Sequence, residues 1–183
     1  MSFYPTGACN FFRFPLSEIE NQSVDMIDIF NTEIRQIEEV LYLKERLKDK
    51  VAVIENFLIR QYDPIPTYDD LLIQKGIEIV KNCKGQTNAI YLSDCLYKTP
   101  KTLERKFSQY LGKSTKQVIK LLRFKEVLND LSFNKELSLT EHAFNNGYFD
   151  LSHYTHDFKS YTGYTPKEFV EKFPDFNMDT ETC

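Results

Sequence analysis

The C-terminal half of this 183-residue chain repeats itself imperfectly at an offset of 51 residues. Each copy has a residue that can cap a helix, apolar positions three or four residues apart, a glycine that can end the helix, and a second capped helix start. Both copies must therefore bury the same kind of helical face. Two copies are typical of paired recognition modules, because duplex DNA presents its major groove once in every turn. The clearest pairs are Phe107 and Phe158, Tyr110 and Tyr161, Gly112 and Gly163, Ser114 and Thr165, and Lys116 and Lys167.

Composition narrows the class of protein. Hydrophobic residues make up 42% of the chain and glycine is scarce, which suits a helical protein with one or two modest cores. No segment approaches the length of a membrane span, and the first residues lack the layout of a signal peptide. The 4 cysteines are scattered without a C-x-x-C spacing, so neither a disulfide framework nor a zinc knuckle is indicated. A cytoplasmic protein with no membrane partner is expected.

Charge is distributed unevenly along the chain. Residues 1–80 carry a net charge of −6, residues 81–172 carry +5, and residues 173–183 carry −3. A basic segment can attract phosphates even when the whole protein is acidic. Two solvated helical domains of opposite sign would give the same distribution, so the pattern supports nucleic-acid binding without establishing it.

The N-terminal part is predicted to be short and mostly helical. Residues 10–14 could form a strand, and apolar spacing predicts a helix from Ser23 to Leu41 and another over residues 44–61. Residues 62–66 contain two prolines one residue apart, which cannot continue a helix. The boundary is therefore placed there, giving a partial regulatory or oligomerisation segment (1–62), a C-terminal domain (67–172) and an acidic tail (173–183).

The C-terminal domain is predicted to contain two helix-turn-helix units. The first has a helix starting at Asn88 and a second helix that Thr99 caps and Pro100 opens. The second has a support helix over 138–146 and a helix over 151–162 capped by Asp150. Between them, residues 116–131 form an amphipathic helix about 24 Å long, while adjacent major-groove entries lie about 34 Å apart.

The outer face of each second helix carries the candidate DNA contacts. On the first, the face opposite Leu103 and Phe107 presents Lys101, Glu104 and Arg105. Arginine can bind guanine through two hydrogen bonds, glutamate can accept from cytosine, and lysine can reach a base or a phosphate. Such residues also cover ordinary surface helices, so most of the support for DNA binding comes from the repeat. The matching positions in the second copy are Ser152, Thr155 and His156.

These motifs resemble the DNA-binding domain of AraC/XylS-type transcriptional regulators. The resemblance rests on residues 99–107 (TPKTLERKF), residues 147–158 (GYFDLSHYTHDF), Arg123-Phe124 and residues 163–169 (GYTPKEF), and it covers about residues 67–172. It implies an all-α fold, with seven helices forming two helix-turn-helix units joined by a linker helix. It also implies double-stranded DNA as partner, with both second helices in adjacent major grooves. The N-terminal residues resemble, more loosely, the closing part of the family's regulatory domain.

The chain departs from the family pattern at four positions. Tyr97 stands where the first turn usually has glycine, and Thr115 where the first copy usually has proline. His142 replaces a buried isoleucine, and His156 replaces an arginine that faces the bases. The resemblance therefore implies that the second helix-turn-helix binds DNA more weakly or contacts mainly phosphates.

Enzymatic function finds no support in the sequence. His153 and His156 lie three residues apart, and Asp150, Asp157 and His142 could add ligands, but this spacing is common by chance and no H-E-x-x-H motif accompanies it. No phosphate loop, dinucleotide glycine pattern or G-x-S-x-G motif is present. We expect no catalytic residues, no metal and no cofactor.

A helical interaction module whose DNA-binding domain has decayed is the alternative. Tyr97, His142 and His156 favour it slightly. Self-association, or contact with RNA polymerase, is expected through the N-terminal segment. The sequence does not identify an effector.

Overall fold

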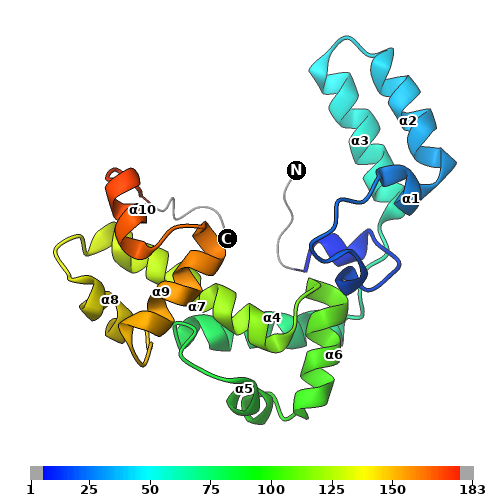
Figure 1. Ribbon diagram of the computed structural model, residues 1–183. Coiled ribbons are helices and arrows are strands. Elements are labelled where there is room, and N and C mark those ends of the chain that lie inside the picture. Colours follow the sequence, from blue (N-terminus) through cyan, green and yellow to red (C-terminus); the bar gives the residue numbers. More distant parts are fainter. Residues whose placement is uncertain (1–5, 178–183) are drawn as a thin grey trace. The chain divides into compact units, whose positions relative to one another are not determined.

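The computed structural model describes residues 6–177, so Met1–Pro5 and the last six residues of the predicted acidic tail lie outside the described residues. Within that range the protein is all-helical and has no strand, which confirms the predicted fold class (Figure 1). Seven of the α-helices, α4 to α10, fall within residues 67–172. The helices are α1 (Met26–Phe30), α2 (Thr32–Tyr42), α3 (Leu47–Gln61), α4 (Thr67–Asn82), α5 (Ala89–Cys95), α6 (Pro100–Leu111), α7 (Thr115–Phe133), α8 (Leu139–Asn145), α9 (Leu151–Thr162) and α10 (Pro166–Lys172), with two short 3-10 helices, Ala8–Asn10 and Leu16–Ile19.

Two N-terminal predictions were wrong. The predicted strand at residues 10–14 is irregular chain that follows a 3-10 helix. The predicted single helix after Ser23 is two helices, because Asn31 adopts a left-handed φ of 53° and separates α1 from α2. Asp25 rather than Ser23 caps α1, its side chain accepting from the backbone of Ile27.

Asn10 explains why its segment is irregular. Its side-chain oxygen accepts from the backbone N–H of Ile65 at 3.0 Å, and its carbonyl oxygen accepts from the N–H of Asp63 at 2.7 Å. Its side-chain amide donates to the carbonyl of Thr6 at 2.9 Å. Since these bonds satisfy the backbone of the proline-rich residues 62–66, no strand partner is needed.

Helices α1, α2 and α3 share a small core. Helix α2 packs against both α1 and α3, and Figure 1 shows α2 and α3 as a helical hairpin. Ile34, Ile37 and Phe57 are buried between them, and the ring of Phe30 meets that of Phe57 edge-on at 5.0 Å. This core stabilises the N-terminal segment that sequence periodicity predicted to be helical.

The chain divides into two compact units. The first compact unit contains the described residues up to 74 together with residues 101–114, and the second contains residues 75–100 and 115–177. The first therefore includes α1–α3, the start of α4 and most of α6. The second includes α5 and α7–α10. This grouping does not follow chain order, and the boundary placed at residues 62–66 stays a prediction.

The core of the second compact unit is formed by α7, α8 and α9. Its buried residues are Phe124, Val127, Leu131, Ala143, Tyr148, Tyr154 and Phe158. Phe158 meets the ring of Phe124 edge-on at 5.5 Å and that of Phe169 at 5.3 Å, so α9 is fixed between α7 and α10. This core positions the helix that carries three of the candidate DNA contacts.

Candidate nucleic-acid interface

The second helix-turn-helix begins with well-defined caps. Ser138 and Glu141 form a capping box at the start of α8, and Gly147 makes the turn with a φ of 72°. The side chain of Asp150 then caps α9 by accepting from the backbone N–H of His153 at 2.7 Å. The predicted support helix and the predicted Asp150 cap are therefore confirmed.

Helix α9 buries one face and exposes the other. Tyr154 and Phe158 are 0% exposed. Ser152 and His156 are exposed, and Thr155 is half-buried. Tyr161, the repeat partner of the buried Tyr110, remains 40% exposed, although its ring stacks on Phe124 at 4.5 Å. The structure thus brings Ser152, Thr155 and His156 together on the outer side of α9.

Asp157 organises a small charged cluster behind that outer face. Its carboxylate is buried and accepts a hydrogen bond from Lys120 of α7 at 3.1 Å. The ring nitrogens of His153 and His156 lie 3.7 and 4.0 Å from the same carboxylate. The sequence suggested Asp157 only as a candidate metal ligand. Its pairing with Lys120 was not predicted, because no local pattern connects residues on two different helices.

Helix α6 presents the other predicted contacts. It begins at Pro100, as predicted, and buries Leu103 and Phe107 at 0% exposure and Tyr110 at 8%. Lys101, Glu104 and Arg105 are exposed on the opposite side. Their spacing of three and four residues places them on one face.

Lys106, by contrast, is not available on the surface of α6. Its ammonium group forms a buried ion pair with Asp69 of α4, and the hydroxyl of Tyr110 donates to the same carboxylate at 2.8 Å. Burial alone would raise the pKa of Asp69, but the hydrogen bonds from Lys106 and Tyr110 outweigh it and lower that pKa. Burial and the hydrogen bond to Asp69 raise the pKa of Tyr110 to about 12. Lys106 therefore has a structural role, because it ties α6 to α4 through Asp69.

His142 is a further buried polar residue that the motifs singled out. Its side chain is 2% exposed, and its Nδ1 lies 2.6 Å from a carboxylate oxygen of Asp130 on α7. Asn146 donates to the same oxygen at 2.9 Å. Burial opposes ionisation of Asp130, but hydrogen bonds from His142 and Asn134 lower its pKa. An internal polar partner thus replaces the apolar packing that an isoleucine would give.

Among residues 6–177, no group of three or more histidine, cysteine, aspartate or glutamate side chains could hold a metal ion. Within the same range, no helix combines the length and the apolar character needed to cross a bilayer.

Comparisons with known proteins agree with this architecture. Residues 92–172 match a family described as a helix-turn-helix domain. The C-terminal domain of AraT, a response regulator from Geobacillus stearothermophilus, is similar with 19% identity and a TM-score of 0.52, over 61% of this chain and 91% of that chain. A DNA-binding transcriptional dual regulator from Escherichia coli K-12 is similar with 20% identity and a TM-score of 0.49, over 55% of this chain and 96% of that chain. No curated protein matches the chain.

The fold and the family match define a DNA-binding domain. Residues 92–172 are an AraC-type helix-turn-helix domain, which confirms the resemblance indicated by the motifs. Domains of this type act in transcription regulation and are generally not enzymes.

Proposed function

We propose that this protein is a sequence-specific transcriptional regulator that inserts α6 and α9 into two adjacent major-groove segments. One observation carries the proposal: both helices bury an aromatic face, and of the six residues expected to face the bases, five are exposed and Thr155 is half-buried. The proposed contacts are Lys101, Glu104 and Arg105 on α6, and Ser152, Thr155 and His156 on α9.

The two helices are proposed to contribute unequally. Arg105 offers a bidentate donor for guanine, and Glu104 offers an acceptor for cytosine. On α9, Ser152 and Thr155 offer hydroxyls with little base preference, and His156 becomes a cation only on protonation. Helix α6 is therefore proposed to supply most of the specificity, while α9 supplies weaker base contacts or phosphate contacts.

A helical interaction module with a decayed DNA-binding domain is the second candidate. Tyr97 favours it, because this turn residue adopts a left-handed φ of 52° that glycine would adopt without strain. The end of the α2–α3 hairpin favours a protein partner, since Tyr42 is 90% exposed and Leu43 and Leu47 are both 77% exposed. A second copy of the chain or RNA polymerase is proposed to bind there, and any effector is unknown.

Arg105→Ala tests the base-reading role. Specific DNA would first be selected from a random pool with the full chain, and affinities for selected and random DNA would be measured by fluorescence anisotropy. We expect a loss of about 1–3 kcal/mol on selected DNA, a smaller loss on random DNA, and relaxed preference at one base position.

Arg35→Ala is the matched control. It removes the same charge from an exposed arginine outside residues 92–172, and we expect it to leave the preference for selected DNA unchanged. Equal losses on both DNAs for Arg105→Ala would refute the base-reading role. A wild-type protein that yields no selected sequence would favour the interaction module.

A further inference from the structure

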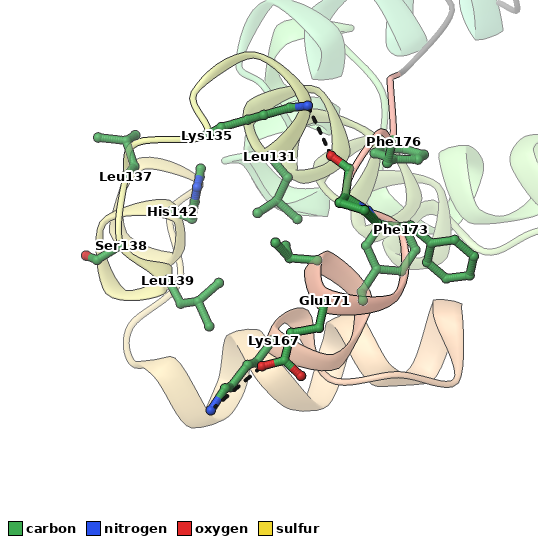
Figure 2. A pocket seen from close by; sticks show the side chains of 13 residues that line it. Leu131, Lys135, Leu137, Ser138, Leu139, His142, Lys167, Glu171, Phe173 and Phe176 are labelled. Carbon is green, nitrogen blue, oxygen red and sulfur yellow. Dashed lines mark hydrogen bonds and ion pairs between the residues drawn. The ribbon is translucent and has the colours of Figure 1, made fainter.

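A cavity of about 380 Å³ lies in the second compact unit, away from the outer face of α9 (Figure 2). It is lined by the end of α7, by α8, and by α10 with the residues that follow it. Figure 2 shows Leu131 and Leu139 on one side of the opening and Phe173 and Phe176 on the other. A cavity of this size can enclose a small organic molecule.

The aromatic wall of the cavity is already ordered. The ring of Phe169 lies 5.0 Å from that of Phe173 and 5.1 Å from that of Phe176. Phe169 also packs on Phe158 of the buried core. An apolar ligand would therefore enter a preformed site without a large ordering cost.

The charged groups at the cavity favour an anion. Among residues 6–177, Lys135 donates to one acceptor, the backbone carbonyl of Pro174, at 3.2 Å. Lys167 lies 4.0 Å from Glu171, and both side chains are mostly exposed (77% and 66%), so this pair holds the lysine weakly. Two lysines and one glutamate thus line a mainly apolar cavity, with the glutamate next to Lys167 on α10.

His142 supplies a polar group inside the cavity. Its ring is buried, and Asp130 occupies Nδ1. Among residues 6–177 no hydrogen bond is recorded for the other ring nitrogen, Nε2. Because Asp130 occupies Nδ1, Nε2 of a neutral ring is an acceptor, so the rim lysines rather than His142 would hold an anionic end.

The geometry points to a binding site for a small apolar monocarboxylic acid in this cavity. Its walls come from the three helices that hold α9, since α8 and α10 both contact α9 and α7 shares its core. A ligand that binds only the folded state stabilises it by mass action. Binding at this site therefore stabilises the packing around the second helix-turn-helix.

Isothermal titration calorimetry on the full chain without DNA tests the site. The probes are octanoate, 1-octanol and octylamine, which share one chain and differ in the charge of the polar end. We expect octanoate to bind saturably with one molecule per protein, 1-octanol to bind at least about tenfold more weakly, and octylamine to give no saturable binding. Octanoate should also raise the melting temperature.

Charge reversal at the rim separates the proposed site from general hydrophobic binding. The double variant Lys135→Glu/Lys167→Glu should lose octanoate affinity at least about tenfold and gain affinity for octylamine. The matched double variant Lys116→Glu/Lys159→Glu makes the same charge change at exposed residues that do not line the cavity, and it should keep wild-type octanoate binding.

Filling the cavity gives an independent check. Val170 lines the cavity and is 46% exposed, so Val170→Trp can add bulk without disturbing the core. It should block octanoate. Any one of three results would overturn the proposal, whatever the outcome with DNA. They are equal binding of octanoate and 1-octanol, equal losses in the two double variants, and wild-type octanoate affinity in Val170→Trp.

Discussion

At the scale of single residues, the pairing of Lys106 with Asp69 distinguishes a structural lysine from its exposed neighbours on α6. Lys106 and Asp69 are 15% and 7% exposed in their side chains, while Lys101 is exposed. Removing one partner of a buried pair leaves an uncompensated charge. Lys106→Met should therefore lower the free energy of unfolding by about 3 kcal/mol, measured by urea denaturation.

Two further measurements test the structural role of the Lys106–Asp69 pair. Lys101→Met, on the same helix, should change stability by less than about 0.5 kcal/mol. Because the pKa of Asp69 lies below its ordinary value, its stabilisation is present above about pH 4 and is lost as the pH falls through the lower native value. That acid-induced loss should shrink in Lys106→Met. If Asp69→Asn/Lys106→Met is no more stable than Lys106→Met, the buried charge is not the cause.

His156 gives the second prediction at this scale. Its side chain is 84% exposed, and its Nδ1 lies 4.0 Å from the carboxylate of Asp157. Because this exposed ring lies on the proposed DNA-facing side of α9, it can hydrogen-bond a base or a phosphate. His156→Ala should therefore weaken binding to selected DNA by about 1 kcal/mol in anisotropy titrations.

The other histidines require a control. His153 lies 3.7 Å from the same carboxylate, and Lys120 also contacts it, so His153→Ala should be compared. An unchanged affinity for selected DNA in His156→Ala would remove this residue from the proposed contacts.

At the scale of elements, two glycines have similar positive φ angles but different surroundings. Comparing them distinguishes the cost of a steric clash from the cost of a strained backbone. Gly85, before α5, has a φ of 69°, and a Cβ there would lie 2.5 Å from the backbone of Arg123 on α7. Gly163, after α9, has a φ of 78° and no atom within 4 Å of the Cβ position. The first glycine permits close packing, while the second serves only the helix end.

Alanine substitution should reveal that difference. Gly163→Ala should cost about 1 kcal/mol, the cost of a left-handed non-glycine residue. Gly85→Ala should cost more than twice as much, because Arg123 also donates to the carbonyl of Gly85 at 3.0 Å and that packing would have to shift. Similar melting temperatures for the two variants would show that α7 is not tightly packed at Gly85.

At the scale of the whole molecule, local charge matters more for DNA binding than net charge. The chain has a net charge of −4, but residues 81–172 carry 15 lysines and arginines against 10 aspartates and glutamates. Phosphate contacts release counterions, so affinity for random DNA should fall linearly in log salt, by more than about tenfold between about 50 and 200 mM. Anisotropy with the full chain measures the slope. A flat line would favour the interaction module.

The sequence by itself determined the features that depend on neighbouring residues. Asn88 and Asp150 cap α5 and α9, Pro100 opens α6, and Phe107 and Phe158 are buried, all as predicted. Caps and apolar faces are fixed by residues one to four positions apart, so local pattern suffices. The same pattern correctly placed Lys101 and Arg105 on the exposed face, while their role in DNA binding stays a prediction.

Only the tertiary structure decided which polar side chains pair with residues far away in the sequence and which apolar side chains stay exposed. The apolar side chains of Leu71 and Ile90 are 59% and 67% exposed, because a helix covers only the apolar side that finds a partner. Lys106 pairs with Asp69, which lies 37 positions earlier, and His142 pairs with Asp130 on the preceding helix. Local periodicity describes one helix at a time, whereas burial and pairing depend on which helices meet.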